Sequence, residues 1–517
     1  MNLETIIGLE IHVQLKTKSK MFCGCGNDGE YQPPNTTVCE VCLGHPGVLP
    51  VPNKQAIEWA IRVALALNCE INTEQRFDRK HYFYPDLPKA YQISQLDYPI
   101  GENGYLEVRL PMTRGQVAKN NHGDIARIGI NRLHIEEDAA KNFHSQNGKM
   151  RIDYNRGGTP LIEIVTEPDI KSPQSAKIFL QELRLIMRYL GVSDADMEKE
   201  HLRCDANISL RPEGEEKLYP KTEIKNLNSF KAVERALEYE ILRQTKLWEA
   251  GSPTESESTR GWSEQSQTTV EQRGKEGSAD YRYFPEPDIP PIKIEEETRN
   301  EKPETEFFGF SIKQIKSEIP ELPIARRERL VESGVKYADA KTITEDLALA
   351  DYFEEVYSLF KSWAEERSEG EWEANREKAI KLVTGWLINR LGGILSNQKR
   401  SWKELEITPE QFIDFLTFIF EGRLNSSNGQ VVLAEMVETG NDPEDIVESR
   451  RLEQTSDADE LESMIASVIE SHPDEVAKYK DGKRELIKFF VGQVMKESKG
   501  TANPGLATEI LKSALDK

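Results

Sequence analysis

An alternating pattern near the N-terminus predicts a β-strand that carries chemistry on one face. From residue 7 to residue 15 every odd position is apolar, and every even position is polar or glycine. Side chains two residues apart lie on the same face of a strand, so Glu10 and His12 are expected side by side. Residues 202–211 repeat the pattern, with Asp205 and Asn207 on the polar face and a second apolar face turned to a core.

A helix with both ends marked is expected between these two strands. Ser172 suits the N-cap, Pro173 suits the first helical position, and Gly191 suits the C-terminal end. Apolar residues recur between them at helical spacing and are expected to pack against the sheet. These residues are Phe179, Leu183, Ile186 and Leu190.

The distribution of strand and helix patterns predicts an α+β protein. Residues 1–294 are expected to form a mixed α/β domain with a mainly antiparallel sheet, in which residues 246–280 are exposed hairpins or loops. After the Pro-rich stretch 286–294 the pattern becomes helical, which predicts a helical domain over 295–407 and a second one over 408–517. The strongly charged stretch 362–377 is expected to be a solvated insertion.

Composition and charge narrow the class of protein. Of 517 residues, 38% are hydrophobic and 30% are charged, and no apolar run approaches the ~18–20 residues that span a bilayer. The N-terminus has no basic segment before its apolar stretch, so no signal peptide is expected and the protein is placed in the cytoplasm. The formal net charge of −22 disfavours a nucleic-acid partner. Residues 475–517, however, hold nine Lys/Arg against six Asp/Glu, and this stretch is either a polyanion-binding surface or a solvated tail.

Four cysteines with paired spacing predict a structural zinc site. Cys23, Cys25, Cys39 and Cys42 form two close pairs joined by a short loop, which can place four thiolates tetrahedrally around Zn²⁺. The alternative is a group of reduced thiols without metal. Zinc binding contributes on the order of 10–16 kcal/mol to the folding of small peptides. Loss of one thiolate is therefore expected to unfold the segment around the four cysteines locally.

A scattered acidic set suggests a hard divalent cation, Mg²⁺ or Mn²⁺. Its members are Glu10, His12, Glu136, Glu137, Glu163 and Asp205. Carboxylates with one imidazole suit such an ion better than they suit zinc. Strand faces often carry carboxylates without any metal, but Glu163 lies in an apolar run where a charge needs a partner.

The segment 79–92 packs cations, aromatic rings and two prolines into a stiff loop. Such a mixture can hold a phosphate or stack on a base, and the alternative is a surface loop closed by an aromatic plug. No P-loop and no nucleophile elbow are present in the sequence, and neither Cys69 nor Cys204 looks like a nucleophile.

Long stretches of the chain resemble a known family. They are IGLEIHVQLKTKSKMF, PGVLPVPN, FDRKHYFYPDLPKAYQISQ, HIEEDAAK, DYNRGGTPLIEIVTEPDI, LRCDANISLRP, EIKNLNSF and DYRYFPEPD, with GQVMKESKGTANP near the C-terminus. They resemble the B subunits of the aspartyl/glutamyl-tRNA(Asn/Gln) amidotransferases, the GatB type of the GatB/GatE family. The resemblance implies a catalytic cradle domain over 1–294, a helical linker over 295–407 and a YqeY-like, tRNA-binding tail over 408–517.

The same resemblance implies an ATP-dependent carbon–nitrogen ligase that uses glutamine as its nitrogen donor. The B subunit phosphorylates the side-chain carboxylate of Asp-tRNA(Asn) or Glu-tRNA(Gln) and amidates it with ammonia from an amidase-type A subunit. A small C subunit completes the heterotrimer, and a non-discriminating synthetase is a further optional partner. The cofactors implied are ATP and Mg²⁺ for catalysis and Zn²⁺ for structure.

Site residues follow from the family motifs. The implied Mg²⁺ ligands are Glu10, His12, Glu137 and Glu163, and the implied catalytic lysines are Lys80 and Lys89. The implied residues of the substrate area and ammonia path are Tyr82, Tyr84, Arg79, Asp205 and Asn207. Ala140 stands where the family has Gly, which costs about 1 kcal/mol or more if the position needs positive φ.

Two other functions compete with this interpretation. A non-catalytic tRNA-binding zinc protein would keep the cysteines and the basic tail without needing clustered acidic residues. An archaeal-type E subunit would carry an inserted synthetase-like domain, but the stretch DYRYFPEPDI passes almost directly into the helical region.

Overall fold

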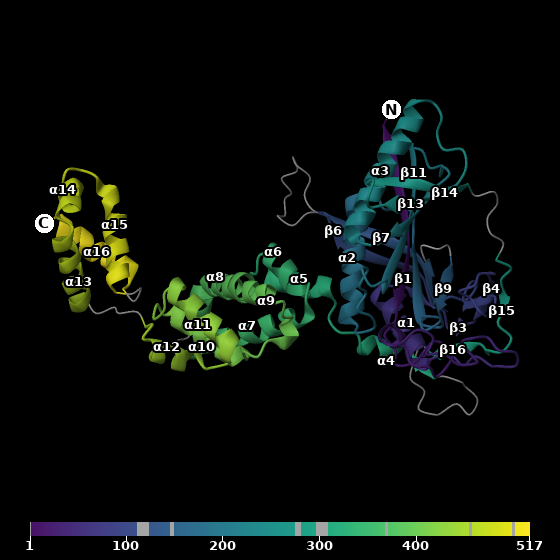
Figure 1. The fold of residues 1–517 in the computed structure, drawn as a ribbon, viewed down its shortest axis with the longest axis horizontal. Helices are drawn as coiled ribbons and strands as arrows, with labels where there is room; N and C mark the ends of the chain where they lie inside the picture. Colours follow the sequence, from purple (N-terminus) through teal and green to yellow (C-terminus); the bar gives the residue numbers. More distant parts are fainter. Residues whose placement is uncertain are drawn as a thin grey trace. The chain divides into compact units, whose positions relative to one another are not determined.

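A computed structural model describes residues 2–110, 124–144, 149–274, 281–295, 309–367, 371–453, 458–498 and 502–516 (Figure 1). It contains two compact units, residues 1–323 and 324–517. The first unit extends past the expected limit at residue 294, because β17 (Phe310–Ser311) pairs with β16 (Ile292–Glu295) and α4 (Ile312–Ser317) contacts α1 (Lys54–Ala66). Within the described residues, no helix combines the length and the apolar character needed to cross a bilayer.

A nine-stranded sheet forms the frame of the first unit. Its order is β14-β13-β12-β11-β1-β10-β7-β6-β2. Its strands are β1 (Leu3–Gln14), β2 (Glu70–Ile71), β6 (Gly101–Arg109), β7 (Ile125–Glu137), β10 (Pro160–Thr166), β11 (Leu202–Pro212), β12 (Thr222–Leu227), β13 (Ser258–Ser263) and β14 (Thr268–Gly274). Among these strands every pairing is antiparallel except that of β12 with β13, which confirms the mainly antiparallel α+β fold.

Smaller strands flank the large sheet. β4 (Asp78–His81) pairs with β5 (Tyr91–Ser94) and β15 (Phe284–Pro285), β3 (Glu74–Gln75) pairs with β16, and β8 (Lys141–His144) pairs with β9 (Met150–Asp153). Part of the stretch expected to be hairpins or loops is indeed the hairpin β13–β14. Residues 275–280 of that stretch lie outside the described residues.

The central strand β1 separates a core face from a polar face, as its alternation predicts. Ile7, Leu9, Ile11 and Val13 are at most 1% exposed. Helix α1 contacts β7, α2 (Pro173–Tyr189) contacts β6, and α3 (Phe230–Glu249) contacts β11; α2 and α3 lie along the sheet in Figure 1. The polar side chains of β1 therefore point to the opposite face of the sheet.

The ends of α2 confirm the expected helix signals. Ser172 caps the helix by accepting a hydrogen bond from the backbone N–H of Ser175 at 3.1 Å, and Pro173 follows at the first position. Gly191 has a φ of 69°, which lets the chain turn away after the last residue. The expected sheet-facing residues Phe179, Leu183, Ile186 and Leu190 are all buried.

The second unit is helical in its described residues. Its helices are α5 (Pro323–Glu332), α6 (Tyr337–Thr344), α7 (Leu347–Arg367), α8 (Glu371–Thr384), the π-helical segment η2 (Gly385–Leu391), α9 (Gly392–Gln398), η3 (Trp402–Glu404), α10 (Pro409–Phe420), α11 (Ser426–Thr439), α12 (Pro443–Arg450), α13 (Ala458–Ser471), α14 (Pro473–Lys480), η4 (Arg484–Leu486), α15 (Ile487–Glu497) and α16 (Pro504–Leu515). Of the charged stretch 362–377, residues 362–367 belong to α7 and residues 371–377 to α8, so these parts are helical rather than a solvated insertion, and residues 368–370 lie outside the described residues. Ala364 and Trp372 from it are 2% and 3% exposed in the core, because the charges occupy only the outer sides of these helices.

Two hydrophobic cores hold the second unit. One includes residues from Leu330 to Val447, and the other includes residues from Leu461 to Leu515. The expected boundary at residue 408 falls inside the first core, because the side chains of α10 that follow it are buried there. The chain therefore passes from one core to the next between residues 447 and 461.

Candidate functional site

Four neighbouring strands contribute one residue each to a row across the polar face. His12 on β1 lies opposite Arg203 on β11 and Glu163 on β10, and Glu163 lies opposite His134 on β7. Antiparallel pairing brings residues that are far apart in the chain to the same level of the sheet. In the row, the carboxylate of Glu163 thus lies between two imidazoles, and Arg203 follows His12 on the next strand.

The imidazoles of this row hold two buried carboxylates. His12 Nε2 lies 3.3 Å from Glu163 Oε2 and 3.6 Å from Glu136 Oε1. His134 Nε2 lies 3.3 Å from Glu163 Oε2 and 3.7 Å from Glu136 Oε2. Glu136 also accepts a hydrogen bond from Ser94 Oγ at 2.9 Å. Glu136 and Glu163 are 2% and 4% exposed, so neither is screened by bulk water.

The charges in this cluster shift one another's protonation. Burial disfavours the charged form of His134, but Glu163 and Glu136 outweigh burial and raise its pKa to about 9. Burial likewise works to raise the pKa of Glu163, but His134 and His12 hold it well below its usual value. Burial and the charge of Glu163 raise the pKa of Glu10. The carboxylates of Glu136 and Glu163 thus favour the protonated forms of the imidazoles beside them.

The cluster has the donor set of a divalent-cation site. One ligand atom from each of Glu10, His12 and Glu163 lies within 4.8 Å of the others, and the same holds for His134, Glu136 and Glu163. Carboxylate oxygens with an imidazole nitrogen suit Mg²⁺ or Mn²⁺. A divalent cation would add the positive charge that the buried carboxylates require, so these residues fit such an ion.

Glu137, an expected metal ligand, is not part of this cluster. Successive residues of β7 point to opposite faces, so Glu136 rather than Glu137 joins His134 on the polar face. The carboxylate of Glu137 accepts instead from the ammonium of Lys89 and from the backbone N–H of Ile93, the latter at 3.0 Å. The alternation within LHIEED could have indicated both His134 and Glu136.

Asp205 and Asn207 lie on the polar face of β11, as expected. Asp205 is opposite Glu10, and its carboxylate is paired with Lys225 at 2.9 Å. Asn207 is opposite Gly8, and its Oδ1 atom is buried without a hydrogen-bond partner.

Strand β4 approaches the cluster through Lys80. Burial lowers the pKa of Lys80, but the charges of Glu136 and Glu163 outweigh burial and raise it above its usual value. Its ammonium also lies 5.2 Å from the ring centre of Tyr281. Lys80 is therefore a cation held close to the buried carboxylates.

Other residues of the segment 79–92 have different surroundings. Arg79 donates to Glu286 at 2.6 and 2.8 Å, which ties β4 to the segment after β15. Tyr82 and Tyr84 are stacked with ring centres 5.9 Å apart and are exposed.

Ala140 is fully buried and has no positive φ, so the backbone strain expected for an alanine at this position does not arise.

The four expected zinc ligands meet in one place. Their sulfurs all lie within 4.8 Å of one another, and those of Cys39 and Cys42 are 3.9 Å apart. A tetrahedral Zn²⁺ with Zn–S bonds of about 2.3 Å requires sulfurs about 3.8 Å apart, so the four thiols fit this metal. Hydrogen bonding from Cys23 lowers the pKa of Cys42 to about 5, whereas burial raises that of Cys25 to about 11.

Lys20 adds a buried positive charge beside these sulfurs. Its side chain is fully buried, and its Nζ lies 3.9 Å from Cys42 Sγ and 3.2 Å from the carbonyl oxygen of Tyr154. A buried ammonium is costly unless a negative charge compensates it. Four thiolates around one Zn²⁺ carry excess negative charge, and Lys20 is placed to balance part of it.

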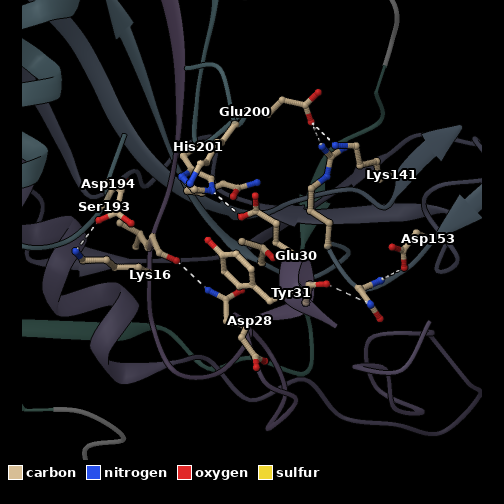
Figure 2. A pocket seen from close by; sticks show the side chains of 18 residues that line it. Lys16, Asp28, Glu30, Tyr31, Lys141, Asp153, Ser193, Asp194, Glu200 and His201 are labelled. Carbon is tan, nitrogen blue, oxygen red and sulfur yellow. Dashed lines mark hydrogen bonds and ion pairs between the residues drawn. The ribbon is translucent and has the colours of Figure 1, made fainter. Parts of the chain in front are cut away.

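A separate cavity of about 200 Å³ lies past the end of β1 (Figure 2). Many of its charged groups form ion pairs with one another. Lys16 pairs with Asp194 at 2.9 Å, His201 with Glu30 at 3.0 Å, and Arg156 with Glu200 at 2.8 Å. These contacts join Lys16, Glu30 and Arg156 to the segment before β11, and they indicate a structural role.

Single substitutions of Glu136 and Glu137 should show which of these two carboxylates belongs to the metal-binding cluster. We expect Glu136→Gln to weaken Mn²⁺ binding at least about tenfold, because it removes an anionic donor of the cluster. Glu137→Gln should leave Mn²⁺ affinity unchanged, because the amide oxygen can still accept from Ile93. Electron paramagnetic resonance of free Mn²⁺ measures both. Loss of binding only in Glu137→Gln would contradict the assignment.

Lys20→Met should weaken zinc retention while preserving side-chain volume. We expect zinc to pass to a chromogenic chelator about tenfold more readily, because the buried charge beside Cys42 is gone. Lys18→Met is the matched control, since Lys18 is exposed two residues earlier. Equal zinc release from both variants would show that Lys20 does not stabilise the metal.

Comparison with known proteins places this arrangement in a family. Residues 5–300 match the GatB/GatE catalytic domain, and residues 372–515 match the GatB domain of the YqeY type. The B subunit of the aspartyl/glutamyl-tRNA(Asn/Gln) amidotransferase from Brevibacillus brevis is 44% identical over 515 residues, with 99% of each chain covered. The protein of the same name from Geobacillus thermodenitrificans is 45% identical over 518 residues, with 100% of each chain covered. The cluster of Glu10, His12 and Glu163 lies within the matched catalytic domain, and the chain belongs to the GatB/GatE family.

Proposed function

We propose that this chain is the B subunit of a heterotrimeric tRNA-dependent amidotransferase. It converts Asp-tRNA(Asn), Glu-tRNA(Gln) or both to the corresponding amides, with ATP as the phosphoryl donor. The relatives that carry this name match the chain along its whole length. The observation that carries the chemical part of the proposal is the cluster of buried carboxylates and imidazoles on the polar face of the sheet.

The reaction requires activation because a carboxylate is a poor electrophile. One oxygen of the Asp or Glu side chain attacks the γ-phosphorus of ATP, and ADP departs. Ammonia then attacks the carbonyl carbon of the acyl phosphate, and phosphate departs with the pair of bonding electrons. Each ~1.4 kcal/mol of transition-state stabilisation accelerates such a step about tenfold.

The residues of the cluster position charge for phosphoryl transfer. Glu10, His12 and Glu163 would hold Mg²⁺, with Glu136 and His134 completing the donor set on the other side of Glu163. Bound Mg²⁺ supplies charge neutralisation at the phosphoryl oxygens. Lys80, kept protonated by the buried carboxylates, offers a second positive charge to the same oxygens.

Ammonia comes from an amidase-type A subunit bound to this chain together with a small C subunit. We place its path along the loop 82–89, where Tyr82 and Tyr84 stack and Lys89 lies between the rings of Phe22 and Tyr91. The setting is the cytoplasm, where the four thiols of the zinc site remain reduced.

Glu163→Gln should abolish ATP-dependent amidation in the assembled complex. The carboxylate holds both imidazoles and contributes to both metal-ligand sets, so we expect a loss of at least about 100-fold in kcat. Glutaminase activity of the complex should persist, because that reaction takes place in the A subunit. Simultaneous loss of both activities from an intact trimer would contradict a separate phosphorylation centre.

Deleting residues 458–517 should weaken tRNA binding far more than ATP binding. This deletion removes the second hydrophobic core of the helical unit and leaves the first intact. We expect the Kd for tRNA to rise about tenfold or more, because phosphate contacts from the lysines of this region are lost. Filter binding at fixed salt measures it, and unchanged tRNA affinity would overturn the assignment of this tail.

A further inference from the structure

The turn that closes the four-cysteine segment lies directly against Lys89. Gly44, two residues after Cys42, comes so close that a Cβ atom on this glycine would overlap Lys89 Cγ. The same Cβ atom would lie 3.1 Å from Lys89 Cα and 3.2 Å from Lys89 Cβ. Rotation of the lysine side chain moves Cγ but neither Cα nor Cβ, so a larger residue in place of Gly44 requires the two segments to separate.

Gly44 also belongs to the turn that carries two of the thiols. The backbone N–H groups of Gly44 and His45 donate to carbonyl oxygens within this turn at 3.0 and 2.9 Å, in the pattern of a Schellman motif. The φ of Gly44 is 68°, a left-handed conformation that favours glycine. Because the turn includes Cys39 and Cys42, two metal ligands and the glycine that contacts Lys89 lie on one short piece of backbone.

A second residue beside the thiols reaches the same lysine. Phe22, immediately before Cys23, is 4% exposed, and its ring centre lies 6.0 Å from Lys89 Nζ. The ring packs edge to face against Phe77, with ring centres 5.3 Å apart, and this contact fixes its position. The four-cysteine segment thus borders Lys89 at two points, along its stem through Gly44 and near its ammonium through Phe22.

The position of Lys89 matters because its ammonium is buried in an ion pair. The side chain of Lys89 is 9% exposed, and that of its partner Glu137 is 4% exposed. Glu137 Oε1 also accepts a hydrogen bond from the backbone N–H of Ile93 at 3.0 Å, which holds the carboxylate in place. Displacing the lysine would leave a buried carboxylate without its counter-ion, and such a loss is costly.

We infer that Gly44 is a positioning residue for Lys89, and that through it the four-cysteine segment fixes the Lys89 ammonium on the path of ammonia. The inference rests on the proposed function, in which the loop 82–89 leads ammonia from the A subunit to the acyl phosphate. A displaced Lys89 disturbs the wall of this path, so ammonia escapes before it reacts. The four-cysteine segment thereby contributes to amidation through a packing contact.

Gly44→Ala and Gly47→Ala form a matched pair that tests this role in the assembled heterotrimer. Both glycines have positive φ, 68° and 87°, so both variants carry the same kind of backbone strain. A Cβ atom at Gly47, however, would meet nothing within 4 Å. We expect Gly44→Ala to raise the glutamate released per amide formed about threefold or more, because Lys89 is displaced. Gly47→Ala should leave this ratio at the wild-type value, and equal ratios in the two variants would overturn the inference.

A double variant shows whether Gly44 acts through Lys89. Lys89→Ala removes the Cγ atom that the new methyl group would overlap, and by itself it should raise the same ratio. In that background Gly44→Ala should raise the ratio no further, because the two substitutions disturb one contact. Additive effects, or an unchanged ratio in Lys89→Ala alone, would contradict the role assigned to Gly44.

Zinc release to a chromogenic chelator gives a second readout, which does not require an active complex. Gly44→Ala strains the turn that carries Cys39 and Cys42, so it should accelerate zinc release less in the Lys89→Ala background than in the wild-type background. Equal acceleration in both backgrounds would show that the strain does not come from Lys89.

The proposed function and the role of Gly44 fail in different ways. If the wild-type complex forms no amide on charged tRNA, the proposed function fails. If it forms amide while Gly44→Ala and Gly47→Ala release equal amounts of glutamate per amide, only the role of Gly44 fails.

Discussion

Two buried carboxylates on the polar face of a sheet impose the main constraint on this molecule. Glu136 and Glu163 are almost fully removed from water, and their charges are tolerable only with positive charge close by. His12 and His134 provide it from strands on each side of β10, at distances of 3.3 to 3.7 Å. The pairing of β1, β10 and β7 must therefore be kept in register, because a slip by one residue would point these side chains into the helical layer.

The same constraint explains why the two faces of the sheet differ so strongly. Helices α1, α2 and α3 cover the apolar face, so the burial that stabilises the unit does not depend on the polar face. The polar face can then carry groups that would be unfavourable in a core, including the carboxylates of Glu136 and Glu163 and the unpartnered carbonyl of Asn207. The apolar side chains of β1 thus contribute to the stability of the unit, and the polar side chains on its opposite face belong to the candidate site.

The four-cysteine site likewise places a buried positive charge beside negative groups. Lys20 is buried completely and contacts both Cys42 and the carbonyl of Tyr154, so the charge of the sulfur cluster is linked to the segment that precedes β10. The metal site and the strand that carries Glu163 therefore share a structural support.

The sequence by itself determined the local features, because they depend on neighbouring residues. Alternation placed Glu10 beside His12 on one strand and Asp205 beside Asn207 on another, capping signals located α2, and spacing grouped the four cysteines. The sequence misassigned Glu137 and the stretch 362–377, and it missed His134, Lys20 and the contact of Gly44 with Lys89. Those features depend on which strand lies beside which, and on what packs against a helix from elsewhere in the chain. Only the tertiary structure decides such long-range pairing, since no short window of sequence contains both partners.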